Sequence, residues 1–278
     1  MINQLKTVIL LGALTGLLLL VGGYFGGTTG LTIALAFSVI MNFGSYFFSD
    51  KIVLAMYSAK PVTKADNPKL HKIVEEVAEK AGIPKPKIYI IKSPNPNAFA
   101  TGRGPKNAVV ACTDSIMTLL NEHELKGVIA HEISHVKNRD ILIATIAATI
   151  AGVISYIAQM AQFAAIFGGG RDNENSGNAF GMLAMAIITP IIAMIIQLAI
   201  SRSREYLADQ TGALTIKESK GLASALAKLE HGPKLTSGNT ATASLFISNP
   251  FRASTLTNIL STHPATAERI KRLNALKL

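Results

Sequence analysis

The sequence predicts a mainly α-helical membrane protein with four transmembrane helices and a cytosolic α+β part that contains a small sheet. Three observations lead to this fold class. Mean hydropathy is +0.35, charged residues make up only 16% of the chain, and the apolar residues are concentrated in four blocks. Because soluble domains average about 25% charged residues, this chain is too apolar for an ordinary soluble protein.

Each of the four blocks has at least 18 residues and no Asp, Glu, Lys or Arg. About 20 helical residues, rising 1.5 Å each, cross a hydrocarbon core of about 30 Å, so each block can span a membrane. The second block carries Asn42 and Ser45, which makes a buried core helix a stronger alternative there. Lys6 before the first block would suit a signal peptide, but no A-x-A-like cleavage site follows, which favours an anchor. The blocks are Thr7–Phe25, Leu31–Phe48, Ile141–Phe167 and Phe180–Ile200.

Basic residues predict the orientation of the spans. Lysines follow the second span at Lys51 and Lys60, and arginines follow the fourth at Arg202 and Arg204, whereas the connection between the first two spans is uncharged. Since cytoplasmic loops are enriched in Lys and Arg, both termini and the residues between spans two and three are predicted to be cytoplasmic. The sequence thus predicts a transmembrane hairpin at 1–50, cytosolic parts at 51–140 and 201–278, and a second hairpin at 141–200.

The formal net charge of +10 indicates a lipid partner rather than nucleic acid. Much of the positive charge lies beside the predicted spans, where the positive-inside bias and attraction to anionic lipid explain it. No pattern of interleaved aromatic and basic residues accompanies it, so no nucleic-acid partner is expected. Cys112 is the only cysteine, which excludes an intramolecular disulfide and suits a reducing cytosolic face.

Periodicity predicts the soluble elements. Residues 67–81 place Leu70, Val74 and Val77 on one face of a helix that Gly82 and Pro84 end. Short runs separated by turns rich in Pro, Asn and Gly predict a small sheet, and residues 232–261, rich in Ser, Thr, Asn and Gly, predict a long loop. The predicted strands are Lys87–Ile91, Ala98–Thr101 and Ala108–Ala111, and the further helices are Ser115–Leu120, Glu122–Asp140, Arg204–Leu214, Lys217–Leu229 and Ala265–Leu276.

A metal-binding pattern lies just before the third span. His131 and His135 enclose Glu132 in an HExxH pentapeptide, and on a helix the two histidines share one face, so both imidazoles can bind a single zinc ion. Glu132 then lies beside the metal, where a carboxylate can take a proton from the attacking water. This combination is typical of enzymes that hydrolyse amides. The alternative is a chance arrangement of surface residues, which the apolar approach at 128–130 argues against.

The third ligand follows from the predicted hairpin. Catalytic zinc usually has three protein ligands and one open position. Residues just outside the two cytoplasmic ends of an antiparallel hairpin must lie near each other. His135 is six residues before Ile141 and Glu205 is five after Ile200, which puts both at nearly the same height. Glu205 is therefore the predicted third ligand, and the alternatives are His263, Glu230 and Glu268.

Other charged residues near the motif bear on its surroundings. Asp209, one turn after Glu205, can accept the outer N–H of His131 and fix its tautomer. Asp140 either has a structural role at the helix end or supports the metal site. Besides Glu132, the helix of the motif carries six charged residues, a density too costly for the hydrocarbon interior, so the site is predicted at the cytoplasmic surface of the membrane. They are Glu122, Glu124, Lys126, Lys137, Arg139 and Asp140.

These motifs, with Ser203–Asp209 after the fourth span and His263-Pro264 and Arg269 near the end, closely resemble the HtpX family. Its members are membrane-bound zinc endopeptidases of bacteria and archaea, related to the CAAX prenyl proteases and the mitochondrial Oma peptidase. The resemblance covers essentially the whole chain. It implies a gluzincin-like zinc protease domain in which one Zn²⁺ is bound by His131, His135 and Glu205, with Glu132 as general base.

The resemblance implies further roles. His263 is a candidate for stabilising the oxyanion, Arg269 would pair with Asp209, and an edge strand would align an extended substrate. It also implies a multi-pass protein of the bacterial cytoplasmic membrane whose substrates are misfolded or damaged membrane proteins, cut in protein quality control under stress. The sequence makes no prediction of oligomeric state. The edge-strand residues are Asn97, Ala98, Phe99 and Ala100.

Two other classes of function are less well supported. A zinc-binding membrane scaffold or chaperone without proteolysis would usually close its zinc site with four protein ligands, whereas three are identified and Glu132 would have no purpose. A transporter would be expected to carry charged or paired polar residues within its spans, and these spans lack them.

Overall fold

The computed structural model describes residues 2–25, 27–102, 104–167, 176–231, 247 and 264–278. Contacts along the chain divide it into two compact units. The first unit comprises Met1–Ser45 and Ile143–Ile200, and the second comprises Tyr46–Leu142 and Ser201–Leu278.

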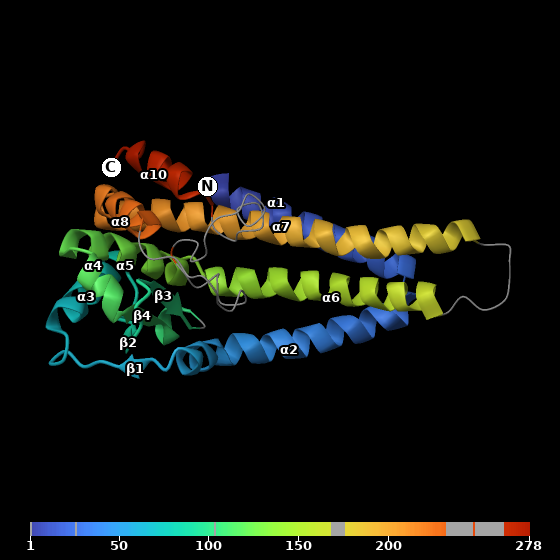
Figure 1. Cartoon of the computed structure of the whole chain (residues 1–278), viewed down its shortest axis with the longest axis horizontal. Coiled ribbons are helices and arrows are strands. Elements are labelled where there is room, and N and C mark those ends of the chain that lie inside the picture. The colour runs from blue at the N-terminus through green and yellow to red at the C-terminus, as the bar shows by residue number, and fades with distance from the viewer. Residues whose placement is uncertain (1, 26, 103, 168–175, 232–246, 248–263) are drawn as a thin grey trace. The chain divides into compact units, whose positions relative to one another are not determined.

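The first unit is helical (Figure 1). It contains α1 (Ile2–Phe25) and most of α2 (Gly27–Met56), α6 (Asp140–Phe167) and α7 (Ser176–Ile216). By length and composition, one helical stretch in the described part of the chain, Ala184–Ile216, is apolar enough to cross a membrane. Small and aliphatic side chains of α1, α6 and α7 form its buried cluster, which consists of Leu18, Val21, Ala147, Ala151, Val153, Ile154, Ile157, Ala193 and Ile200.

The second unit contains a four-stranded mixed sheet in the order β1-β2-β4-β3. Strands β2 and β4 are parallel, and the other two pairs are antiparallel, so β3 forms one edge of the sheet. Two predicted strands, β2 and β3, have the predicted bounds, whereas β4 is displaced toward Thr113 and β1 was not predicted because two residues give no periodic signal. The strands are β1 (Lys60–Pro61), β2 (Lys87–Ile91), β3 (Ala98–Thr101) and β4 (Val109–Thr113).

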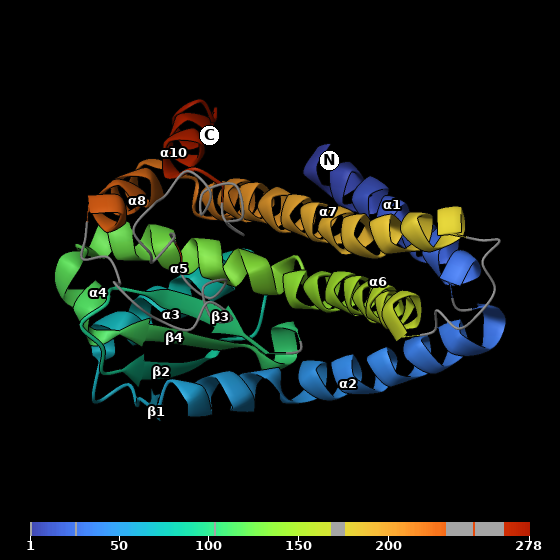
Figure 2. The same ribbon diagram turned by 45° about the vertical axis from the view of Figure 1, so that its right-hand side comes forward.

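Each face of the sheet packs against different helices because side chains alternate along a strand. On one face, Ile88 and Val110 join the main core with α3 (Pro68–Ala81) and α5 (Glu122–Lys137). Figure 2 shows α5 running beside this sheet. On the other face, Phe99 and Ala111 pack against the end of α2. The sheet therefore anchors α5, the helix that carries the HExxH pentapeptide.

The caps of the helices have clear local causes. The Asn67 side chain accepts the Leu70 N–H at the start of α3, and Gly82, with φ 69°, ends that helix in the left-handed conformation. Asn121 and Glu124 form a reciprocal capping box at the start of α5. The remaining elements of this unit are α4 (Asp114–Leu119), the 3-10 turn Pro105–Asn107, α8 (Lys220–His231) and α10 (Thr266–Asn274).

Two predicted boundaries differ from the structure. The predicted span ending at Ile200 and the helix predicted from Arg204 are one continuous helix, α7, because no helix-breaking residue separates them. The helix predicted to reach Asp140 ends instead at Lys137, since Arg139 adopts a left-handed φ of 56° and α6 begins anew at Asp140. The predicted loop at 232–261 lies outside the described residues apart from Ile247.

Candidate metal centre

Helix α5 and helix α7 bring together the three side chains predicted as metal ligands. The Nε2 atoms of His131 and His135 are 3.1 Å apart. From α7, Glu205 places Oε1 3.4 Å from His135 Nε2 and Oε2 3.6 Å from His131 Nε2. Across the described part of the chain, this is the group of His, Cys, Asp and Glu side chains close enough to hold a metal ion. Glu230 and Glu268 are not part of it, and His263 lies outside the described residues.

The spacing of these three groups fits zinc. Bonds of about 2.0 to 2.1 Å in a tetrahedral arrangement separate neighbouring ligand atoms by about 3.3 Å. The three measured separations, 3.1, 3.4 and 3.6 Å, bracket that value. Two imidazoles and a carboxylate are also a donor set that zinc hydrolases use. The residues present therefore fit one zinc ion.

Carboxylates orient both histidines. His131 Nδ1 is 2.9 Å from Asp209 Oδ1, and His135 Nδ1 is 2.7 Å from Asp140 Oδ2. A neutral imidazole that donates its Nδ1–H to a carboxylate keeps its lone pair on Nε2, so this network assigns the tautomer that leaves both Nε2 atoms free to bind a metal. The structure thus brings Asp209 to the predicted place. It also brings Asp140 to His135. This contact agrees with support of the metal site, which is one of the two roles that the sequence left open for Asp140.

Arg269, on α10, completes the surroundings of His131. Its Nε and Nη2 donate to Asp209 Oδ2 and Oδ1 at 2.9 and 2.7 Å, a bidentate pair. Its Nη1 donates to the carbonyl oxygen of Ile247 at 2.7 Å and lies 3.4 Å from Glu205 Oε2. Burial alone would lower the pKa of Arg269, but the nearby carboxylates, Asp209 foremost, raise it above its usual range. Arg269 is therefore a permanent cation within the site.

Arg204 is a site residue that sequence reasoning missed. Its guanidinium contacts the carboxylate of Asp140, and its Nη2 donates to the carbonyl oxygen of Asn138 at 3.0 Å. In the sequence, Arg204 counted as a positive charge after a span and as part of the Ser203–Asp209 motif, with no role at the metal site. Its position directly before Glu205 is the one signal in the sequence that places it near the metal site. That position does not show which way the Arg204 side chain points.

Glu132 is buried between the candidate metal ligands and the sheet. Its Oε2 accepts a hydrogen bond of 2.9 Å from the Ala100 N–H on β3. Burial raises the pKa of the Glu132 carboxyl, and this effect outweighs the lowering by the two histidines. A carboxylate whose pKa is raised is a stronger base, which is the property that proton abstraction requires.

The predicted edge-strand residues lie at an edge of the sheet. Among the described residues, β3 pairs with β4 alone, and the backbone hydrogen-bonding groups alternate in direction along it, so the N–H and C=O groups of Ala98 and Ala100 point away from β4. The buried Asn97 donates its N–H to Thr113 Oγ1 at 2.9 Å, and its Oδ1 accepts the Ile247 N–H at 3.2 Å. The buried ring of Phe99 packs 5.5 Å from that of Tyr57. Glu132 is thus bonded to the outer side of an edge strand.

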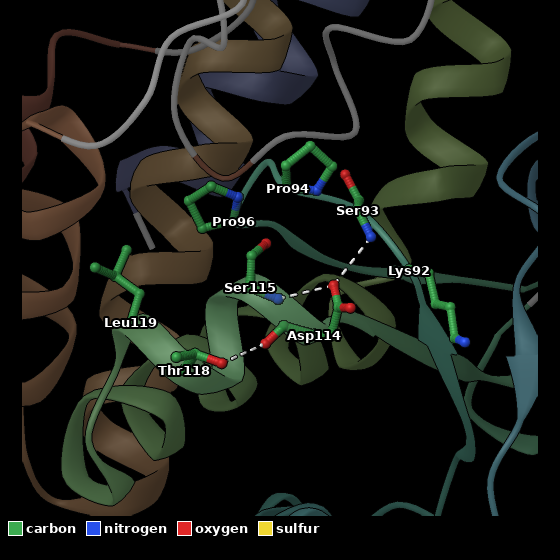
Figure 3. A pocket seen from close by; sticks show the side chains of 8 residues that line it. All are labelled: Lys92, Ser93, Pro94, Pro96, Asp114, Ser115, Thr118 and Leu119. Carbon is green, nitrogen blue, oxygen red and sulfur yellow. Dashed lines mark hydrogen bonds between the residues drawn. The ribbon is translucent and has the colours of Figure 1, made fainter.

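An open hollow of ≈ 820 Å³ lies elsewhere, after the ends of β2 and β4. Figure 3 shows Asp114 among its lining residues, where Oδ1 accepts the N–H groups of Ser93 and Ser115 at 2.9 and 3.0 Å. None of the candidate ligands lines it, so its size does not make it the metal site. Its lining residues are Lys92, Ser93, Pro94, Pro96, Asp114, Ser115, Thr118 and Leu119.

Residues 64–277 match the peptidase family M48. The chain belongs to this family. Its curated relatives are described as protease HtpX homologs. The homolog from Syntrophobacter fumaroxidans is 50% identical over 99% of this chain and 99% of its own. The homolog from Aquifex aeolicus is 54% identical over 93% and 88%, and that from Pyrococcus abyssi is 50% identical over 99% and 96%. The predicted resemblance to the HtpX family is thus confirmed.

A solved structure shares the fold. The crystal structure of Ste24p from S. mikatae superposes with a TM-score of 0.62 at 20% identity, covering 98% of this chain and 65% of that one, so this chain spans about two thirds of its length. As a member of the HtpX group, the protein is a membrane-associated metalloprotease. The alternative of a zinc-binding scaffold or chaperone without proteolysis has no support from these comparisons.

Proposed function

We propose that this M48 member is a zinc-dependent endopeptidase that cuts misfolded or damaged membrane proteins at the cytoplasmic surface of the membrane. One observation carries the proposal. The donor atoms of His131, His135 and Glu205 lie within 4.8 Å of one another, beside the buried carboxylate of Glu132. Substrate choice and the role in stress-related quality control follow from the membrane setting and the family resemblance.

Each side chain has a distinct proposed task. His131, His135 and Glu205 bind the zinc ion, and Asp209 with Arg269 keeps His131 in position. The chemistry that zinc supplies at such a site is Lewis-acid catalysis, because it polarises a carbonyl and makes water ionise near pH 7. Glu132 accepts the proton of the attacking water on its carboxylate and passes it to the leaving amine. His263 is proposed from the resemblance alone to donate a hydrogen bond to the oxyanion.

Strand β3 is the proposed substrate-aligning surface. An extended peptide can add to an exposed sheet edge through main-chain hydrogen bonds. The Ala100 N–H lies 2.9 Å from Glu132 Oε2 on the outer side of β3. A peptide that pairs with residues 97–100 would therefore bring a backbone carbonyl close to the proposed general base.

Four helices are proposed to cross the bacterial cytoplasmic membrane. Large apolar side chains are exposed along α1 and α7. Examples are Leu20 on α1, which is 74% exposed, and Ile195 on α7, which is 57% exposed. Such continuous apolar surface suits lipid rather than water. The apolar stretch Ala184–Ile216 has 33 residues and would be about 50 Å long, longer than a hydrocarbon core of about 30 Å. We place its charged end, from Arg202 onward, on the cytoplasmic side.

The base assignment can be tested with Glu132→Gln. We expect this variant to bind zinc like the wild type but to lose cleavage of a membrane-tethered unfolded substrate, because an amide cannot accept the proton. Measurements are zinc content and substrate cleavage of purified full-length protein in nanodiscs. The matched control, Glu122→Gln, changes an exposed carboxylate of the same helix and should leave cleavage unchanged. Substantial residual cleavage by Glu132→Gln would reject Glu132 as the base.

The third ligand needs a separate test. Glu205→Ala should weaken zinc binding, because two imidazoles alone leave the ion short of a protein ligand. Zinc content after dialysis against a weak chelator measures this, with the exposed Glu230→Ala as control. Full zinc occupancy in Glu205→Ala would reassign the third ligand.

A further inference from the structure

The geometry points to Asp140 and Arg204 as a positioning pair that holds His135 in its metal-binding orientation. This inference rests on the proposed zinc site and deepens it. Neither residue is one of the three candidate metal ligands. Asp140 acts on the imidazole, and Arg204 acts through Asp140.

The contacts form a chain that starts at the imidazole. His135 Nδ1 is 2.7 Å from Asp140 Oδ2, and the other carboxylate oxygen, Oδ1, contacts Arg204 Nη2. Arg204 Nη2 also donates to the Asn138 carbonyl oxygen at 3.0 Å. Asp140 and Arg204 are both buried, with 7% and 6% exposure. A buried carboxylate held from both sides has one orientation, and so has the ring that donates to it.

The backbone is shaped to make this contact. In a continuous helix, Asp140 would lie about 140° around the axis from His135, because five residues turn by about 500°. The helix instead breaks at Arg139, whose φ of 56° is uncommon for a residue with a Cβ. The break carries Asp140 back to His135 Nδ1. An unfavourable conformation next to a metal ligand indicates that the contact it permits matters.

The two histidines have equivalent surroundings. His131 is held by Asp209, which Arg269 pairs, and His135 is held by Asp140, which Arg204 pairs. One pair joins α7 to α10 and the other joins α7 to α6, so α7 contributes to the positioning of both histidines. Each arginine offsets the charge of its carboxylate, so that neither aspartate is a buried anion without a partner. Helix α7 supplies the candidate third ligand, Glu205. It also supplies Arg204 for the pair beside His135 and Asp209 for the pair beside His131.

Zinc affinity of the purified full-length protein in detergent, measured by competition with a chromophoric chelator, tests the inference. Loss of the partner of a ligating histidine typically weakens metal binding about 10- to 100-fold. We expect a loss in that range for Asp140→Ala and a smaller one for the nearly isosteric Asp140→Asn and for Arg204→Met. Arg204→Lys should recover part of the loss, since it restores the cation. Lys137→Met, which removes an exposed cation at the same helix end, should bind zinc like the wild type.

A positioning role and a merely structural one differ in two readouts. If Arg204 acts through Asp140, Arg204→Met added to Asp140→Ala should lower zinc affinity no further. The visible spectrum of the cobalt-substituted Asp140→Asn protein should change, because the ligand field reports the orientation of His135, while the helical circular dichroism stays as in the wild type. Wild-type zinc affinity in Asp140→Ala, or additive losses in the double variant, would overturn the inference. If the wild type itself binds no zinc, the proposed function fails and this inference fails with it.

Discussion

Four buried charges near the two histidines each lie beside an opposite charge. Asp140, Arg204, Asp209 and Arg269 are all at most 7% exposed. Burial of an unpaired charge is costly, and removal of one partner leaves the other without compensation. These pairs therefore matter less for net stability than for the fixed orientation of the groups they hold.

Arg269→Met should be strongly destabilising as well as harmful to zinc binding. It leaves Asp209 buried without its cation and removes the hydrogen bond to the Ile247 carbonyl. We expect the free energy of unfolding to fall by about 3 to 5 kcal/mol, as for other broken buried pairs. Denaturant unfolding of the purified protein measures this. Arg272→Met on the same helix, where the side chain is 47% exposed, should cost at most about 1 kcal/mol, and an equal loss in both variants would contradict the argument.

At the scale of elements, α5 is positioned by its neighbours more than by its own sequence. Its capping box fixes where it begins, and Glu124 accepts hydrogen bonds from Ser224 and Lys228 of α8 at 2.7 Å each. Burial favours the protonated form of Glu124, but these bonds and the Asn121 N–H outweigh burial and hold its pKa below the usual range. The contact between α5 and α8 therefore fixes the helix that carries the histidines.

Gly127→Ala should disturb this contact. A Cβ at Gly127 would lie 2.5 Å from the backbone nitrogen of Leu222 in α8, so the helices must separate. Alanine gains up to about 1 kcal/mol in helix propensity over glycine, but overpacking costs about 1 to 3 kcal/mol, so we expect a net loss of about 1 to 2 kcal/mol. Thermal unfolding in detergent measures the change. Gly12→Ala in α1, where a Cβ meets nothing within 4 Å, is the control, and an unchanged or more stable Gly127→Ala would contradict the close approach.

The sequence predicted elements best where one pattern dominates. Apolar periodicity and terminal Asn and Gly predicted α3 within one residue, and short runs bounded by turn residues predicted β2 and β3. It failed at β1, whose two residues form a strand only because β2 offers an antiparallel partner. It also failed at the break at Arg139, since arginine carries no signal for a left-handed φ. That conformation depends on the contacts that Asp140 gains.

At the scale of the whole molecule, Cys112 offers a way to test the membrane topology. Its thiol is fully buried in β4, and burial raises its pKa to about 12, with a further contribution from the charge of Glu132. Because the thiolate is the reactive species, folded wild type should not react with maleimide at pH 8 but should react after denaturation. The natural chain is thus an unreactive background for single introduced cysteines.

Labelling in sealed membrane vesicles should then show the predicted N-terminal membrane hairpin and a cytoplasmic C-terminal part. We expect cysteines at Lys51 and Lys277 to react with an impermeant maleimide only from the cytoplasmic side, and one at Thr29, in the first turn of α2, only from the opposite side. The positive-inside rule predicts this because lysines follow α2 and no charge lies between α1 and α2. Reaction of Thr29→Cys from the cytoplasmic side would reject the N-terminal membrane hairpin.

The sequence by itself determined the helix face that carries His131 and His135, the apolar blocks and the family, because each depends on residue spacing along one stretch of chain. It also pointed to Glu205, since a predicted hairpin constrains its two ends. Only the tertiary structure decided that Arg204 pairs with Asp140 and that Glu132 is bonded to β3. Those contacts join residues far apart in the chain, and their partners are selected by packing, which leaves no periodic signal in the sequence.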